Sequence, residues 1–129
     1  DVDNFKHVND TYGHPCGDKV LQAIAGMLQD RFREGDGIGR IGGDEFMVIF
    51  SLRQNMPAVE KKLVKLVHGV PEVAWGKDRI CVSISVGAAV WAQDSYENLY
   101  KRADRALYQV KQKNKGSYII DQGLGKDLG

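Results

Sequence analysis

The chain has 129 residues and a formal net charge of +1 at pH 7, from 18 Lys and Arg against 17 Asp and Glu. This length supports one domain with a single core, and 43% hydrophobic and 27% charged residues are ordinary for a soluble globular protein. The balanced charge argues against a nucleic acid polymer as partner, and no apolar run approaches membrane-spanning length, so we expect no membrane contact by this domain. Cys16 and Cys81 are isolated, which favours reduced thiols and a cytoplasmic location.

The first part of the chain predicts a polar loop and then a long helix. Residues 4–14 are polar and have some helical character. From Pro15 or Gly17 to about Arg33, apolar residues recur at three- and four-residue spacing, which is typical of an amphipathic helix. The residues of this apolar stripe are Val20, Leu21, Ile24, Ala25, Leu28 and Phe32.

The stretch from Ile38 to Phe50 predicts a hairpin, because two apolar runs flank Gly42-Gly43-Asp44-Glu45. Carboxylates held beside a backbone without side chains suit a divalent cation and a phosphate chain that approaches the main chain closely. The alternative is a solvated hairpin tip, since motifs as short as this one have high false-positive rates.

The second half predicts further helices and strands in alternation. We expect a helix from Pro57 to His68, a second hairpin over residues 73–90, a helix that begins near Ser95 and a strand over Tyr118–Ile120, followed by a frayed tail. Within the hairpin, residues 81–87 alternate small polar and branched apolar side chains, as a half-buried strand does. The pattern predicts a two-layer α/β sandwich. The third long helix should bury Leu99, Ala103, Ala106, Leu107 and Val110.

Three blocks of sequence carry a resemblance to a known family. They are Asp1-Val2-Asp3-Asn4-Phe5-Lys6-His7-Val8-Asn9-Asp10 with Tyr12-Gly13-His14 and Gly17-Asp18, then Gly42-Gly43-Asp44-Glu45-Phe46, then Ala103-Asp104 with Ala106-Leu107-Tyr108 and Lys111. In this order they resemble the GGDEF domain of diguanylate cyclases, and they cover nearly the whole chain.

The resemblance implies an α/β (α+β) fold of the ferredoxin-like kind, the palm of class III nucleotidyl cyclases, with helices packed on a central antiparallel or mixed sheet. We expect the domain to span residues 1–120 and a flexible tail to span residues 121–129. In the family a helix and a strand precede the position of Asp1, so we expect this chain to lack its first helix and most of its first strand.

The implied activity joins two GTP molecules, one held by each domain of a homodimer, into cyclic di-GMP with release of pyrophosphate. Such a reaction needs neutralised phosphates and in-line geometry, and Mg²⁺ (or Mn²⁺) supplies much of the neutralisation. Asp1 and Asp44 match the metal ligands, with the Val2 carbonyl as a third ligand. Asp44 or Glu45 would help to activate the attacking hydroxyl. The alternative for Asp1 is a solvated acid.

Base selection is implied for Asn9 and Asp18, with His14 lining the same pocket. Guanine offers two adjacent N–H donors that one carboxylate accepts together. The alternative is structural, with Asn9 capping a turn and Asp18 in the first turn of a helix, where its charge is favourable.

The phosphates would be held by the main chain of the loop Asn4-Phe5-Lys6, with Phe5 and Lys6 as its binding residues, by Gly42 and Gly43, and by two lysines. These are Lys111 and Lys115, and the second stands where the family commonly has Arg, so it lacks the guanidinium fork and GTP should be held more loosely. Both lysines would also favour the C-terminus of a helix, which is the alternative.

Arg33-x-x-Asp36 matches the family's product-inhibition site, where Arg33 forks onto a guanine or phosphate of cyclic di-GMP and Asp36 accepts from a guanine edge. The alternative is a helix-ending Arg with a loop Asp. We expect the parent protein to carry a sensor or receiver domain. Two other functions stay open: a catalytically inactive module that binds GTP or cyclic di-GMP, and a mononucleotide cyclase of the same fold.

Overall fold

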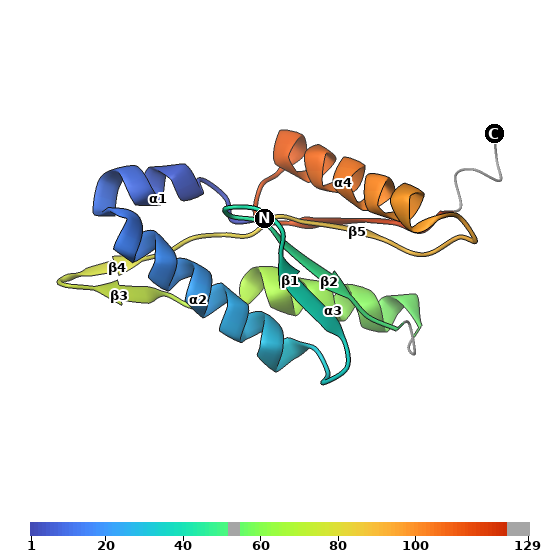
Figure 1. The fold of residues 1–129 in the computed structure, drawn as a ribbon, viewed down its shortest axis with the longest axis horizontal. Helices are drawn as coiled ribbons and strands as arrows, with labels where there is room; N and C mark the ends of the chain where they lie inside the picture. The colour runs from blue at the N-terminus through green and yellow to red at the C-terminus, as the bar shows by residue number, and fades with distance from the viewer. Residues whose placement is uncertain (52–54, 124–129) are drawn as a thin grey trace.

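The computed structural model describes residues 1–51 and 55–123 and has four helices and six strands in that part of the chain (Figure 1). The helices are α1 (Phe5–Tyr12), α2 (His14–Arg31), α3 (Met56–His68) and α4 (Tyr96–Lys113). The strands are β1 (Gly37–Arg40), β2 (Phe46–Ile49), β3 (Val73–Trp75), β4 (Asp78–Ile80), β5 (Val86–Ala89) and β6 (Tyr118–Asp121).

The helix ends show where local sequence decides the structure. Gly13, at φ 93°, separates α1 from α2, so most of the expected polar loop is a helix of its own. At the other end, α2 stops at Arg31, two residues before the limit expected from the sequence, and Phe32 is already in extended backbone. The expected N-cap of α4 is confirmed, because the Ser95 hydroxyl accepts a hydrogen bond from the Asn98 N–H at 3.1 Å.

The strands pair as a mixed α+β fold, as the sequence predicts. β1 and β2 form the expected antiparallel hairpin, with Ile38 opposite Val48, and β3 pairs with β4 in the same way. β5 and β6 run parallel. β6 continues to Asp121, and residues 124–129 lie outside the described residues, so the flexible tail stays a prediction.

The segment before β5 departs from the expected alternation. Regular strand begins only at Val86, and Ile84 makes a single bridge to Val2. Ser85 is fully buried, whereas a half-buried strand would turn this polar residue outward. The expectation of a regular half-buried strand over residues 81–87 is therefore wrong, and the reason is a buried polar partner for Ser85 described below.

The helices cover two sides of the strands. In Figure 1, α4 lies above β5, while α2 and α3 lie below it. Gly87 allows α4 to approach β5 closely, since a Cβ at this position would overlap the main chain of Ala103 and Leu107. The main core lies on the α2 and α3 side, and its most buried members include Val20, Ile24, Leu28, Leu63, Leu66 and Ile84.

A buried arginine fixes the start of α4, and the sequence pattern did not predict it. The Arg102 guanidinium pairs with Asp94 at 3.1 Å and with Asp121 at 3.2 Å, and it donates to the Val90 carbonyl at 2.7 Å. The hydrogen bond to Asp94, with the charges of both carboxylates, raises the pKa of Arg102 against the opposing effect of burial. These contacts join α4 to the ends of β5 and β6.

Arg102→Ala should lower the free energy of unfolding by about 3–5 kcal/mol, because it removes the cation that offsets two carboxylates, one of them buried. Arg105→Ala is the matched control, since Arg105 lies exposed on the same helix and should change stability by no more than about 0.5 kcal/mol. Urea unfolding followed by circular dichroism measures both. Equal losses in the two variants would contradict a structural role for the Arg102 network.

Candidate active site

The main chain of residues 1–3 joins the hairpin turn to the segment before β5 by hydrogen bonds. The Val2 N–H donates to the Asp44 carbonyl at 3.0 Å, on the hairpin side. On the opposite side, Asp3 N–H donates to Ser83 O at 2.9 Å, and Ser85 N–H donates to Asp1 O at 2.9 Å. Because the N–H and C=O of one residue in a strand point the same way, the Val2 carbonyl also faces the hairpin.

The side chains of Asp1 and Asp3 meet one lysine from α4. The Lys111 ammonium lies 3.0 Å from Asp1 Oδ2 and 3.9 Å from Asp3 Oδ1. Asp1 Oδ1 is buried and has no hydrogen-bond partner. The Asp1 carboxylate therefore has one oxygen on a lysine and one oxygen free for a further ligand.

Asp3 is a buried carboxylate that is satisfied by hydroxyls. Its two oxygens accept hydrogen bonds from Ser83 Oγ at 2.6 Å and Ser85 Oγ at 2.7 Å. Ser85 Oγ also accepts from the Gly116 N–H at 3.1 Å, which ties in the loop that carries Lys115. This network explains why Ser85 is buried in place of facing solvent.

The hairpin turn is closed by its own main chain. Ile41 N–H and Gly42 N–H both donate to the Glu45 carbonyl, at 2.9 and 3.4 Å, and Arg40 Nε donates to the Gly42 carbonyl at 3.1 Å. Asp44 and Glu45 are half-buried. The turn therefore holds both acids on a rigid loop.

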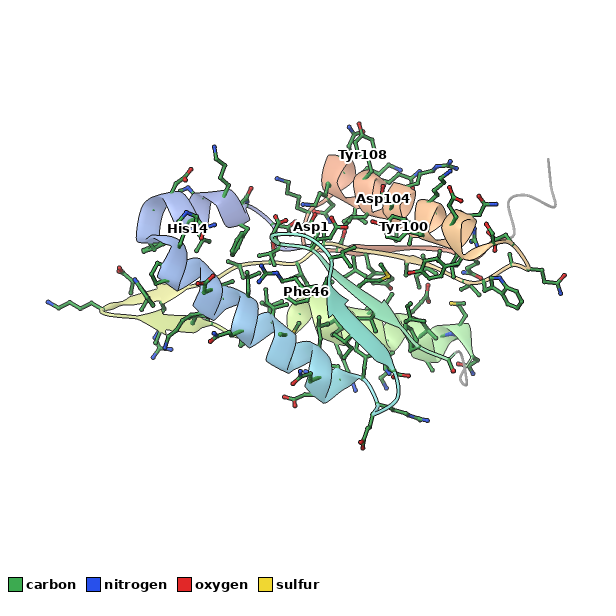
Figure 2. All side chains as sticks on the ribbon, in the orientation of Figure 1. Asp1, His14, Phe46, Tyr100, Asp104 and Tyr108 are labelled. Atoms are coloured by element: carbon green, nitrogen blue, oxygen red, sulfur yellow. The ribbon has the colours of Figure 1, made fainter. Side chains whose placement is uncertain are left out.

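The hydroxyl of Tyr100, on α4, is influenced by the negative charge of this turn. The Glu45 carboxylate raises the pKa of the Tyr100 hydroxyl, and burial, Asp104 and Tyr96 add to the same effect. Figure 2 shows Asp1 beside the turn, with Tyr100 and Asp104 on the helix above it.

Within the part of the chain that the structure describes, no three His, Cys, Asp or Glu side chains form a ready-made metal site.

This donor set nevertheless fits a magnesium-like ion. Mg²⁺ in nucleotide sites is typically held by one or two carboxylates together with substrate phosphates, and protein cages of three or more side chains are not required. The buried and unpartnered Asp1 Oδ1 is an oxygen that lacks a cation, and the Val2 carbonyl faces the Asp44 side. The Asp1 carboxylate and the Val2 carbonyl therefore lie next to the residue that carries the Asp44 carboxylate.

The first turn of α1 offers free N–H groups to an anion. Asn4 precedes the helix in the left-handed conformation, φ 56° and ψ 32°, and its side chain makes no cap hydrogen bond to the helix. Phe5 and Lys6 occupy the first two helical positions, whose N–H groups have no acceptor within a helix. A left-handed residue before right-handed ones makes an anion-binding concavity.

Two lysines lie next to this turn. The Lys115 ammonium donates to Asn4 Oδ1 at 3.2 Å, and Lys111 reaches Asp1 and Asp3. Figure 1 shows the start of α1 and the end of α4 facing each other. The alternative in which both lysines serve the C-terminus of a helix fails for Lys115, because α4 ends at Lys113.

Asn9 and Asp18 lie at the junction of α1 and α2. Asn9 Oδ1 is buried without a hydrogen-bond partner, so the side-chain oxygen caps no turn. Because α2 begins at His14, Asp18 lies in its second turn, and the alternative that placed it in the first turn is wrong. Both Asp18 and His14 are exposed. Their polar groups are therefore available to a ligand.

Gly17 makes the position of Asn9 possible. A Cβ at Gly17 would overlap Asn9 Oδ1 and approach Phe5 Cζ to 3.0 Å. With the amide oxygen turned against Gly17, the amide nitrogen of Asn9 faces the other way.

Arg33 and Asp36 lie apart from these groups. The Arg33 N–H donates to Asp36 Oδ2 at 2.9 Å, and the Asp36 N–H donates to the Arg33 carbonyl at 3.0 Å, so the two residues close a tight local turn. This turn precedes β1, and the Gly42–Glu45 turn follows β1, so the two lie at opposite ends of that strand (Figure 1).

The family model described as the GGDEF domain of diguanylate cyclases matches residues 1–117, which include all of the groups above. The chain belongs to this family. It is 38% identical over 121 residues to diguanylate cyclase DgcS of Shewanella oneidensis, covering 93% of this chain and 40% of the relative. It is 35% identical over 119 residues to diguanylate cyclase DosC of Escherichia coli K12, covering 89% of this chain and 26% of the relative. The chain thus spans between a quarter and two-fifths of the length of these relatives.

Solved GGDEF structures share the fold. Diguanylate cyclase SiaD of Pseudomonas aeruginosa, in complex with its activator SiaC, matches with a TM-score of 0.84 and 32% identity, over 93% of this chain and 47% of that chain. The GGDEF domain of DgcB from Caulobacter crescentus, in complex with c-di-GMP, matches with a TM-score of 0.85 and 28% identity, over 93% and 73%. These similarities confirm the palm fold of the GGDEF cyclases.

Sequence reasoning about this GGDEF domain missed three polar side chains of the site. These are Asp3, Ser83 and Ser85. The signal for all three was present, because Asp1 and Asp3, like Ser83 and Ser85, are two residues apart, which puts each pair on one face of an extended chain.

One cavity of the GGDEF domain measures about 560 Å³ and lies between β2 and β5, with α4 at its rim. Its lining is mainly apolar, and it reaches the charged groups only through Asp1, Glu45 and Asp104.

No helix in residues 1–51 and 55–123 is both long and apolar enough to cross a membrane.

Gly17→Ala should lower the free energy of unfolding by about 1–3 kcal/mol, because the new methyl group overlaps Asn9 and must push α1 away from α2. Gly26→Ala is the matched control on the same helix. A Cβ at Gly26 meets nothing within 4 Å, so this variant should gain about 0.5–1 kcal/mol. Thermal and urea unfolding of both variants measure the difference. A stabilised Gly17→Ala variant would show that Gly17 is not needed for the position of Asn9.

Proposed function

We propose that this GGDEF domain is the catalytic domain of a diguanylate cyclase, which condenses two GTP molecules into cyclic di-GMP and releases pyrophosphate. One observation supports this proposal. Val2 is hydrogen-bonded to Asp44, Lys111 contacts Asp1, and Lys115 contacts Asn4 at the start of α1. Carboxylates for a metal stand beside donors for a phosphate chain.

Asp1, Asp44 and the Val2 carbonyl would hold Mg²⁺ or Mn²⁺. When bound there, the ion neutralises the phosphate chain and lowers the pKa of the attacking hydroxyl. The unpartnered Asp1 Oδ1 supports this assignment. Asp44 or Glu45, half-buried on a closed turn, would accept the proton of the 3′-hydroxyl.

The triphosphate would lie against the free N–H groups of Phe5 and Lys6, with its terminal phosphates on Lys111 and Lys115. Gly42 and Gly43 carry no side chain, so the phosphate chain can approach the hairpin turn closely. A lysine at position 115 offers a single charge where an arginine would offer a fork, which predicts a loosely held substrate.

Guanine would bind at the junction of α1 and α2. The Asp18 carboxylate would accept from the two adjacent donors of guanine, and the Asn9 amide would add hydrogen bonds, with His14 at the edge of the pocket. The exposure of Asp18 and of His14 supports this assignment.

Each domain would hold one GTP, and the 3′-oxygen of one nucleotide would attack the α-phosphate of the other, so the reaction requires a homodimer with facing sites. In the parent protein, a sensor or receiver domain would bring two GGDEF domains together. The relatives are longer than this chain, which agrees with such an arrangement.

Asp44→Ala should lower turnover by about 10²-fold or more, because the metal loses a ligand while two phosphate chains still need neutralisation. A dimerised form is incubated with GTP and Mg²⁺, and the product is identified by chromatography. Asp78→Ala, on β4 away from the site, is the control and should keep full activity. If the unmodified protein binds GTP and makes no product, it is a non-catalytic nucleotide-binding module.

Arg33→Ala should bind cyclic di-GMP at least about tenfold more weakly and escape inhibition by it, because a charge-assisted fork to a dianionic ligand is lost. Turnover at saturating GTP should survive, since this turn lies at the other end of β1 from the hairpin acids. Arg79→Ala removes an exposed arginine elsewhere and serves as the control. Isothermal titration with cyclic di-GMP decides the matter, and unchanged affinity in Arg33→Ala would contradict an inhibitory site here.

A further inference from the structure

Lys111 is expected to bind phosphate, but in this structure its ammonium contacts the Asp1 carboxylate. Its ammonium lies 3.0 Å from Asp1 Oδ2 and 3.9 Å from Asp3 Oδ1, so it sits on the carboxylate proposed to bind the metal. Asp3 already has two hydroxyl donors, at 2.6 and 2.7 Å, and lies farther from the ammonium than Asp1 does. Asp1 is therefore the carboxylate that Lys111 contacts most closely.

An ammonium and a divalent ion cannot both lie against Asp1 without strong repulsion, because like charges a few ångströms apart in a half-buried site are poorly screened. The two would therefore compete for the Asp1 carboxylate. The Lys111 ammonium can move away from Asp1, because its side chain is long and flexible and about a third of it is exposed to solvent.

We propose that Lys111 is the resident cation of the metal-free site, and that it moves from Asp1 to the phosphates when the metal and the nucleotide bind. The inference rests on the proposed function, because it takes Asp1 as a metal ligand and Lys111 as a phosphate ligand. It adds that one side chain couples the two binding steps.

The surroundings of Lys111 support such a movement. It lies in the last turn of α4, which faces the start of α1, where the free N–H groups of Phe5 and Lys6 would hold phosphate (Figure 1). The Lys115 ammonium, 3.2 Å from Asn4 Oδ1, marks the same region. A displaced Lys111 ammonium therefore has an anionic destination beside it once nucleotide is present.

The coupling has two opposite consequences for a variant without this charge. Removal of the Lys111 ammonium leaves Asp1 without its counter-ion, so a divalent cation alone should bind more tightly. The same removal takes a cation from the phosphate site, so a nucleotide should bind more weakly. A lysine that served only as a structural ion pair with Asp1 would produce the first effect without the second.

The test is a Mn²⁺ titration without nucleotide, in which electron paramagnetic resonance measures the free ion. Lys111→Met should bind Mn²⁺ about fivefold or more tightly than the unmodified chain. Lys113→Met, which removes an exposed charge two residues away, controls for the change in net charge and should stay within about twofold. A titration with a non-hydrolysable GTP analogue in the presence of Mg²⁺ should show the reverse order, with Lys111→Met the weaker binder.

Mn²⁺ affinity in Lys111→Met that is no higher than in Lys113→Met overturns the inference. Lys111→Gln keeps a polar group at this position and gives the same comparison if the methionine variant unfolds. The double variant Lys111→Met with Asp44→Ala separates the inference from the proposed function. Tight Mn²⁺ binding that survives loss of Asp44 shows that the metal lies elsewhere, which overturns the proposed metal site as well.

Discussion

The site depends on the hydrogen bonding of three residues at the start of the chain. The main chain of Val2 lies between Asp44 on one side and the residues around Ile84 on the other, and each neighbour is held by hydrogen bonds of 2.9–3.0 Å. Because a strand alternates its side chains, Val2 points into the core while Asp1 and Asp3 point to the opposite face. One short strand therefore brings the carboxylates next to the hairpin acids, and no flexible loop is needed.

The position of α4 completes the site, and polar contacts fix this helix along its length. Near its start, Arg102 pairs with Asp94 in the loop before the helix and with Asp121 at the end of β6. In its middle, Gly87 lets the helix lie directly against β5, and at its end Lys111 reaches Asp1 and Asp3. A shift of the helix by one turn would break the contacts of Arg102 and of Lys111 at once. The position of Lys111 thus depends on contacts at the other end of the helix.

Much of the fold could be predicted from the sequence, because the signals were local. The glycines of the hairpin, the Ser95 cap and the apolar stripe of α2 all act within a few residues, and each formed the expected element. The missed features join residues that are far apart in the chain. Ser85 and Asp3 are 82 positions apart, so a hydroxyl that looked suited to a solvent-facing position is buried by a partner that no local pattern reveals. In the same way, the contact of Gly17 with Asn9 depends on the angle between α1 and α2, which the sequence does not encode in any short motif.

The two turns that flank β1 differ in how ready they are to bind a ligand. In the Gly42–Glu45 turn, main-chain atoms close the loop and the acids remain half-buried, with the ammonium of Lys111 already on the adjacent Asp1. In the turn before β1, Asp36 uses one oxygen to hold the Arg33 N–H, and the Arg33 side chain is exposed. A ligand at the Gly42–Glu45 turn must therefore displace a cation, whereas a ligand at the Arg33–Asp36 turn meets a turn that is already formed. If both proposed sites are correct, product binding needs less rearrangement than substrate binding. Because β1 separates the two turns, a ligand at the turn before β1 would then not compete directly for the metal.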